Sequence, residues 1–287
     1  MSPICIVTDC TAQFRQPSFV GSDLVQVIPL DIELNCQAKR CGEEVKASNL
    51  PKTAWGNLYP KIHPLSEGGF RDLFNSLAQS FDEIIGIFPS AQLISSYTIA
   101  QEAAKSLRGS KKLILVDSQT ISIGLGLLVE RASESIAKGY KLVEVEQIVR
   151  SMIPRIYAVL CTPGLSYMYF NHFLDAGQAI IGEFLGLYPI FAIEDGGLVP
   201  LEKMRNHRNS INYFQEFLDE FDHLQHIALL QSNPMDLQDI HVLREHIHEN
   251  FPKTPFTSHT VNLPLAALFG PQTIGLFVVE TDHHKNG

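Results

Sequence analysis

Short apolar runs alternate with amphipathic stretches throughout the first half of the chain. Runs rich in β-branched residues occupy positions 4–7, 24–34, 83–88 and 113–116, and the second of them is interrupted at Pro29. Between two of these runs, apolar residues recur at the spacing of one helix face: Phe70, Leu73, Phe74, Leu77 and Phe81. A long helix is predicted over residues 121–137. Strands that alternate with helices predict a parallel or mixed sheet covered on both faces.

A second series of elements follows in the other half. The pattern predicts strands at 157–161, 189–193, 226–230 and 273–279, and helices at 209–221 and 237–249. The turn Glu194-Asp195-Gly196-Gly197 predicts a hairpin with residues 198–201 as the returning strand. We place the domain boundary near Met152-Ile153-Pro154. The chain is therefore predicted to be an α/β protein with an N-terminal domain at 1–153 and an α/β C-terminal domain at 154–287.

Ligands of parallel α/β sheets bind outside the carboxyl ends of the strands. The polar turns that follow the predicted strands are therefore the first places to look for chemistry. They are Thr8 to Thr11, Pro89-Ser90 and Asp117-Ser118.

Several common chemistries leave no motif in this chain. The sequence contains no GxGxxG, GxxxxGK[ST], HExxH or GxSxG, which removes the usual signals for nucleotide binding, zinc proteolysis and serine hydrolysis. His241, His246 and His248 share one predicted helix, but no two of them are three or four residues apart. We therefore predict surface histidines, no metal site and no cofactor.

Composition and charge narrow the class of protein. Hydrophobic residues make up 45% and charged residues 18% of the chain, which is enough for a sizeable core. The formal net charge of −9 argues against a nucleic-acid groove and against docking on anionic lipid by charge. No basic leader precedes the first apolar run, no apolar stretch approaches the ~20 residues of a membrane span, and the five cysteines form no CxxC pair. These features predict a cytoplasmic protein with reduced thiols and no stable membrane insertion.

The polar turns, taken in order, resemble those of the DegV family. The first half carries six such stretches: Ile6-Val7-Thr8-Asp9-Cys10-Thr11, Val27-Ile28-Pro29-Leu30, Lys39-Arg40-Cys41-Gly42, Lys61-Ile62-His63-Pro64, Ser90 to Tyr97, and Val116-Asp117-Ser118 with Gly124-Leu125-Gly126. The second half carries three more: Ala179 to Leu187 with Pro189-Ile190, Asp195-Gly196 through Arg205, and Gly270-Pro271 with Ile274-Gly275. No single stretch is specific for this family, but the order and spacing of all of them along nearly the whole chain are specific for it.

The resemblance implies a two-domain EDD fold with one long-chain fatty acid between the domains. In the family, the fatty-acid carboxylate is held by a Thr of a Thr-Ser-Gln-Pro element and by a Ser of a Ser-Ser loop. Some relatives present the acid to a separate fatty-acid kinase. An acyl tail gains about 0.8 kcal/mol per buried CH₂, so an apolar tunnel can bind it with few polar contacts. Leu93, Ile94, Ile180, Phe184 and Phe269 are expected to line that tunnel.

This sequence departs from the family where the ligand head group is expected. The family Thr and Ser fall on Lys61 and Ile62, and the second loop serine falls on Ala91. Leu268 stands where kinase-coupled relatives have His, and His259 is a substitute only if Gly270-Pro271 is misaligned. The basic family loop reads Asn171 to Ala176 here. The resemblance thus implies these ligand-binding residues: Cys10, Thr11, Lys61, Ile62, His63, Ser90, Ala91, Gln92, Ile94, Arg205, Leu268 and Phe269.

Two functions follow from the sequence. The first is a fatty-acid-binding carrier or sensor that is not catalytic alone, with Lys61, His63, Ser90 and loop amides near the carboxylate. A fatty-acid kinase is its candidate partner, although the usual His is replaced by Leu268. The alternative is an enzyme of the same fold, a phosphotransferase relative or a hydrolase, acting on a small amphiphile.

Overall fold

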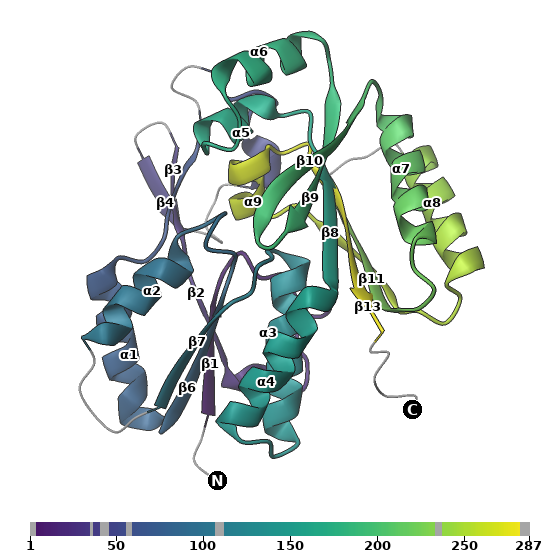
Figure 1. The fold of residues 1–287 in the computed structure, drawn as a ribbon. Helices are drawn as coiled ribbons and strands as arrows, with labels where there is room; N and C mark the ends of the chain where they lie inside the picture. The colour runs from purple at the N-terminus through teal and green to yellow at the C-terminus, as the bar shows by residue number, and fades with distance from the viewer. Residues whose placement is uncertain are drawn as a thin grey trace. The chain divides into compact units, whose positions relative to one another are not determined.

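The computed structural model describes residues 4–34, 37–40, 46–55, 59–106, 112–232 and 237–281 (Figure 1). Contacts divide the chain into two compact units. The first contains residues 1–31, 63–154 and 195–197, and the second contains 32–62, 155–194 and 198–287. The sequence pattern predicts one boundary at 153/154. In the structure, one boundary lies between Pro154 and Arg155. In addition, residues 32–62 belong to the second unit and residues 195–197 to the first, which the sequence pattern did not indicate.

The first unit is built on a parallel four-stranded sheet of order β2-β1-β6-β7. Its strands are β1 (Ile4–Asp9), β2 (Val25–Ile28), β6 (Glu83–Phe88) and β7 (Lys112–Asp117). The register pairs Ile6 with Val25 on one side of β1 and with Ile85 on the other. A short 3-10 helix, η1 (Ser22–Leu24), leads into β2. These strands confirm the predicted parallel sheet.

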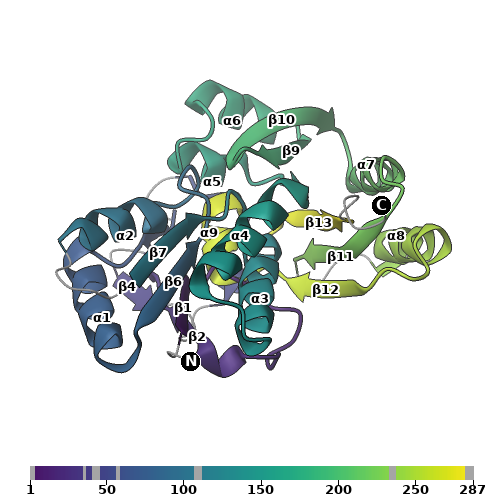
Figure 2. The same cartoon turned by 60° about the horizontal axis from the view of Figure 1, so that its bottom comes forward.

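Two pairs of helices cover the sheet of the first unit. α1 (Glu67–Ser80) and α2 (Ser96–Lys105) lie on one face, and α3 (Ile123–Ala137) and α4 (Leu142–Met152) lie on the other (Figure 2). Side chains alternate along a strand, so Cys5 and Val7 pack with Phe70 and Phe74 of α1 while Ile6 faces the opposite side. The hydrophobic runs of the sequence therefore supply both faces of one buried sheet.

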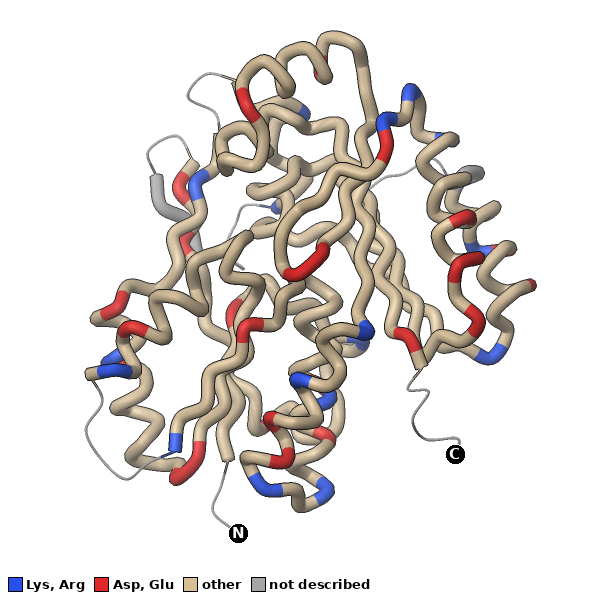
Figure 3. Tube along the Cα trace, viewed as in Figure 1, with Lys and Arg blue, Asp and Glu red and all other residues tan. Residues whose placement is uncertain are grey.

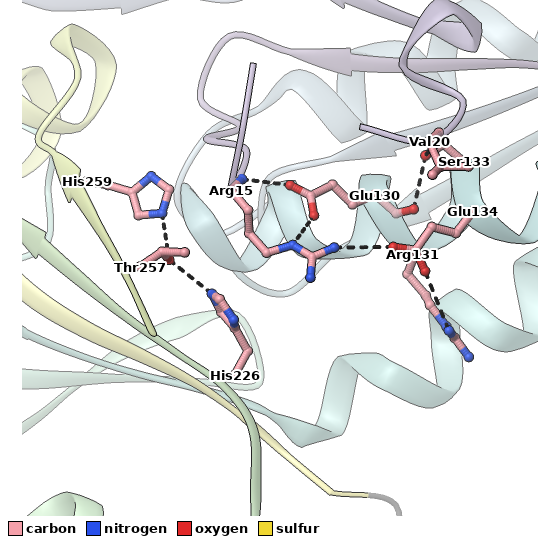
Figure 4. A network of polar contacts seen from close by, with 9 residues as sticks. All are labelled: Arg15, Val20, Glu130, Arg131, Ser133, Glu134, His226, Thr257 and His259. Atoms are coloured by element: carbon pink, nitrogen blue, oxygen red, sulfur yellow. Dashed lines mark hydrogen bonds and ion pairs between the residues drawn. The ribbon is translucent and has the colours of Figure 1, made fainter. Parts of the chain in front are cut away.

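The segment after β1 is fixed against α3. The Glu130 carboxylate is buried and accepts hydrogen bonds from the backbone N–H of Arg15 (2.7 Å) and from its guanidinium Nε (Figure 4). Nη2 of Arg15 reaches Glu134 at 3.2 Å, and the Ser133 hydroxyl donates to Val20 O at 2.8 Å. At the first turn of α3, Gly126 lies directly against the Gln13 backbone. This segment and α3 therefore form one packed piece of structure.

The second unit contains a mixed six-stranded sheet of order β10-β9-β8-β13-β11-β12. Its strands are β8 (Ile156–Cys161), β9 (Tyr188–Glu194), β10 (Gly197–Met204), β11 (Leu224–Gln231), β12 (Phe256–Thr260) and β13 (Ile274–Glu280). β13 is antiparallel to both β8 and β11, whereas β12 is parallel to β11. α7 (His207–Asp219) and α8 (Leu237–Asn250) supply Phe214 and Leu243 to the core beside this sheet.

Shorter elements complete the fold. α5 (Leu165–Phe170), α6 (Ala176–Phe184) and α9 (Leu263–Phe269) belong to the second unit, and η3 (Ile153–Arg155) lies at the boundary. A small sheet of order β4-β3-β5 contains β3 (Asp31–Leu34), β4 (Gln37–Arg40) and β5 (Lys61–His63), with η2 (Ala47–Asn49) in the chain between the last two strands. Both units are thus α/β, as the alternation of elements predicted.

The segment before β5 is anchored within the second unit. Tyr167 OH donates to Pro51 O at 2.5 Å, and Ala54 N donates to Ser166 Oγ at 2.8 Å. Trp55 Nε1 donates to Glu183 of α6 at 2.5 Å. These contacts join residues more than a hundred positions apart, which explains why this segment belongs to the second unit.

Candidate functional site

The turn after β1 is organised around one buried carboxylate. Asp9 Oδ1 accepts from the backbone N (3.1 Å) and the hydroxyl (2.5 Å) of Thr11, and Oδ2 accepts from Ser96 Oγ at 2.7 Å. Burial raises the pKa of Asp9 above its ordinary value, against the lowering effect of these hydrogen bonds. The pKa of Asp9 is therefore higher in the folded chain than in the unfolded chain. The stability that Asp9 contributes falls as the pH rises from about 4, the ordinary pKa of Asp, toward the raised pKa of the folded chain. The Thr11 hydroxyl is thus committed to Asp9.

The turn after β6 is held by the Ser90 hydroxyl. Ser90 Oγ donates to Gly196 O at 2.6 Å and accepts from Gln92 N at 3.2 Å. The Gln92 side chain donates to Asp195 O at 2.8 Å. A hydroxyl has one hydrogen, so Ser90 would have to release Gly196 before it could donate to a ligand carboxylate.

The turn after β7 supplies a second carboxylate. Asp117 accepts from Gln119 N at 2.9 Å, and Ala91 N lies 3.4 Å from both of its carboxylate oxygens. Ser90 N donates to Thr120 O at 2.8 Å. The three turns therefore meet at the carboxyl edge of the parallel sheet, where several of their donors already have internal acceptors.

This edge brings together six of the residues predicted to bind the ligand. They are Cys10, Thr11, Ser90, Ala91, Gln92 and Ile94. Ile94 is buried, whereas Gln92 is exposed and Cys10 is half-buried, with its Sγ accepting from Leu30 N at 3.4 Å. Their roles toward a ligand stay predictions.

Lys61 and His63 lie on the same side of β5, because side chains two positions apart share one face of a strand. Both are exposed, while Ile62 between them is half-buried. Lys61 Nζ lies 5.4 Å from the centroid of the Tyr59 ring, which stacks on Phe170 at 4.0 Å. Strand β5 thus presents two groups that can carry positive charge.

The remaining predicted residues occupy other parts of the second unit. Arg205 is exposed just beyond the end of β10. Leu268 and Phe269 are buried in α9, and Phe269 O accepts the hydroxyls of Thr162 and Thr273. His259 lies on β12, so it and Leu268 belong to different elements.

The side chains expected to line a tunnel separate into two groups. Leu93, Ile94 and Phe269 are buried. Ile180 and Phe184, by contrast, expose 52% and 88% of their surfaces on α6. The buried side of α6 is formed by Ala179 and Gly182. The lining of a tunnel by these five residues stays a prediction.

Two features of the structure do not follow from the sequence: the anchoring of the 195–197 turn and a pair of histidines. The sequence predicts Gly196 only as part of a hairpin, and its role as acceptor for Ser90 leaves no local signal. His226 Nε2 and His259 Nε2 lie 3.0 and 2.9 Å from the Thr257 hydroxyl (Figure 4). Burial lowers the pKa of His259.

The structure also bears on metals, thiols and membranes. No group of three or more His, Cys, Asp or Glu that could hold a metal ion occurs among the described residues. Cys5, Cys10 and Cys161 are free thiols, whereas Cys36 and Cys41 lie outside the described residues.

Within the described part of the chain, every helix is too short or too polar to cross a bilayer. His241 and His248 of α8 are exposed, as predicted, whereas the side chain of His246 is only 17% exposed and contacts Asp219 of α7 at 2.8 Å.

The geometry defines an α/β protein whose polar loops gather at the carboxyl edge of a parallel sheet. The family model described as "Uncharacterised protein, DegV family" matches residues 3–281. The chain belongs to the DegV family.

Two curated relatives illustrate the range of sequence similarity. A DegV domain-containing protein of Caldanaerobacter subterraneus is 27% identical over 218 residues, covering 76% of this chain and 77% of the relative. A DegV domain-containing protein of Clostridium acetobutylicum is 24% identical over 283 residues, covering 98% and 99%.

Solved structures match over nearly the full length. A "fatty acid binding DegV family protein" of Streptococcus agalactiae superposes with a TM-score of 0.84 at 18% identity, covering 98% of this chain and 100% of its own. The structure "Fatty Acid Binding of a DegV family Protein from Thermus thermophilus" gives a TM-score of 0.81 at 20% identity, with the same coverage. A DegV family protein of Eubacterium eligens "loaded with heptadecanoic acid" gives 0.80 at 14%, covering 97% and 100%. These matches establish the fold.

Proposed function

We propose that this chain binds and encloses one long-chain fatty acid, as a cytosolic carrier or sensor in lipid metabolism, and is not catalytic by itself. The observation that carries the proposal is the full-length match to structures described as fatty-acid binding or as loaded with heptadecanoic acid. The parallel sheet with polar loops at its carboxyl edge is also the kind of place where α/β proteins bind ligands.

The carboxylate of a bound fatty acid determines which polar groups the site must provide. A buried carboxylate must be paired or hydrogen-bonded, or it takes up a proton. At the carboxyl edge of the sheet, the hydroxyls of Thr11 and Ser90 already donate to Asp9 and Gly196. Asp117 adds a negative charge there. A cation is therefore the better candidate, which favours Lys61, or His63 when it is protonated.

We propose that the protein does not depend on a fatty-acid kinase as a partner. Leu268, which stands where kinase-coupled relatives have His, is a buried apolar side chain of α9. It offers neither a proton donor nor an acceptor.

Replacing Lys61 with methionine should weaken fatty-acid binding by about 2 kcal/mol, or roughly thirtyfold, as expected for one lost charge-assisted bond. Methionine keeps an unbranched apolar side chain that ends at Cε and lacks the ammonium group, so the change removes mainly the charge. Titration of delipidated protein with a long-chain fatty acid, followed by calorimetry, measures the difference. Arg205→Met should have a smaller effect.

Lys112→Met provides the matched control for this titration. Lys112 is exposed at the first residue of β7, where its Nζ contacts Glu83 at 2.9 Å. This is the opposite end of the parallel sheet from the candidate loops, so binding should be unchanged. Wild-type affinity in Lys61→Met from mildly acidic to mildly alkaline pH would show that Lys61 does not hold the carboxylate. Absence of any fatty-acid binding by the wild-type chain would contradict the function itself.

A further inference from the structure

The turn between β9 and β10 packs directly on the loop that follows β6. Asp195 and Gly196 have φ angles of 48° and 84°, and both central residues of a two-residue type I′ hairpin turn need a positive φ. A Cβ on Gly196 would lie 2.6 Å from Ser90 Oγ and 3.4 Å from Gln119 Cα. Glycine at this position therefore serves both the shape of the turn and its close approach to Ser90.

Two hydrogen bonds hold the 195–197 turn, and both are accepted by its backbone carbonyls. Ser90 Oγ donates to Gly196 O at 2.6 Å, and Gln92 Nε2 donates to Asp195 O at 2.8 Å. The first bond is buried, since Ser90 is 1% exposed, whereas the second lies at the surface. One buried hydroxyl and one exposed amide thus fix the position of the turn.

The buried hydroxyl is the group for which a ligand carboxylate competes. A hydroxyl has one hydrogen, so Ser90 donates either to Gly196 O or to the carboxylate. The carboxylate is the stronger acceptor, because hydrogen bonds to an ionised group are roughly twice as strong as those between neutral groups. Without its donor, the buried carbonyl of Gly196 is unpaired, which is unfavourable until it reaches water. Transfer of this hydrogen bond to a ligand therefore favours release of the turn.

The charge of the hairpin tip acts in the same direction. Glu194 and Asp195 are adjacent and exposed there, and the tip is red in Figure 3. Residues 188–202 contain no lysine or arginine to balance them. The Asp117 carboxylate adds a third negative charge at the same edge of the sheet. A carboxylate that binds at Ser90 is therefore repelled by the tip as well as bound in competition with it.

We propose that the 195–197 turn is an autoinhibitory latch on the fatty-acid site, which the ligand carboxylate opens by taking the Ser90 hydroxyl from Gly196. The latch rests on the fatty-acid binding proposed above, which brings the carboxylate to Ser90. A seated turn holds the hydroxyl and lowers the affinity for the anion. A bound carboxylate displaces the turn into solvent, so the position of the turn distinguishes loaded from unloaded protein.

Hydrogen exchange of peptides that cover residues 193–199 measures the seating of the turn, with heptadecanoic acid as the probe. A saturating amount of this acid, added to the delipidated full chain, should speed exchange of these amides while peptides from β1 and β6 stay protected. In Ser90→Ala, exchange of the turn should be fast before the acid is added, and the acid should cause no further change. The affinity of Ser90→Ala should fall as well, because the shared donor is lost.

Gln92→Met removes the exposed half of the latch and keeps the main-chain N–H of Gln92. The turn is then held by Ser90 alone, so binding of heptadecanoic acid should tighten roughly two- to fivefold, as expected for the loss of one competing hydrogen bond. Gln101→Met is the matched control, since Gln101 is an exposed residue of α2 whose amide contacts Tyr97 OH at 3.5 Å. This control should bind the acid as wild type does.

Faster exchange of the turn on loading, abolished in Ser90→Ala, together with tighter binding by Gln92→Met, supports the latch. Unchanged or slower exchange in a chain that native mass spectrometry shows to be loaded overturns the latch and leaves the fatty-acid function standing. An acid-induced change that persists in Ser90→Ala also overturns it, as does weaker binding by Gln92→Met, which would mean that the Gln92 side chain holds the ligand. A wild-type chain that takes up no heptadecanoic acid overturns both the latch and the proposed function.

Discussion

Replacing Gly126 with alanine should destabilise the first unit by more than about 3 kcal/mol. A Cβ at this position would lie 1.9 Å from the carbonyl oxygen of Gln13 and 2.6 Å from its carbonyl carbon. Both atoms belong to the backbone, so no side-chain rotation can relieve the clash. The segment after β1 must therefore leave α3, or α3 must leave the sheet.

Hydrogen exchange measured on peptides from β1 and α3 reports on this change directly. Trp55, the only tryptophan, reports on the second unit and serves as an internal reference. Gly68→Ala is the matched control, because Gly68 lies in the first turn of α1 and its nearest neighbour is the Arg71 side chain at 3.7 Å. That variant should be stabilised by about 0.5–1 kcal/mol through the lower entropy of its unfolded chain. Equal protection of α3 in Gly126→Ala and in wild type would refute the packing described for this segment.

Glu130→Gln should cost about 2–3 kcal/mol of stability. The Glu130 side chain is 1% exposed and faces the backbone N–H and the guanidinium of Arg15. Glutamine has the same shape, but its amide would point a donor at a donor. Arg15 is 37% exposed and can regain water, which keeps the loss below that of a fully buried pair.

Glu134→Gln isolates the exposed part of the same network. Glu134 contacts Arg15 at 3.2 Å and Arg131 at 3.8 Å with a 30% exposed side chain. Its loss should cost less than about 0.5 kcal/mol, as for most surface pairs. Urea unfolding of both variants measures the difference, and equal midpoints would mean that burial of Glu130 does not matter.

The pattern of apolar residues predicted most strands of the four-stranded and six-stranded sheets, because most of these strands are short and buried. The predicted strand at 83–88 coincides with β6, and the break at Pro29 separates β2 from β3. β12 and α9 left weaker signals. Phe256–Thr260 is a polar, partly exposed edge strand, and Leu263–Phe269 is too short and too uniformly buried to show a helical period.

The candidate site could be predicted only in part. The polar turns after β1, β6 and β7 follow from the rule on strand ends, and the structure brings them together. The partner of Ser90 could not be foreseen, because Gly196 lies 106 residues further along the chain. The same holds for Trp55 and Glu183, which are 128 residues apart. Interactions of this kind depend on tertiary structure and have no local pattern.

Native mass spectrometry of the full chain, purified from cells without added lipid, tests the central claim most directly. We expect a complex heavier than the chain by the mass of one long-chain fatty acid, released as a free acid on denaturation. Delipidated protein mixed with a fatty acid should regain one equivalent. A chain that carries no such mass and takes up no fatty acid when it is offered would contradict the account.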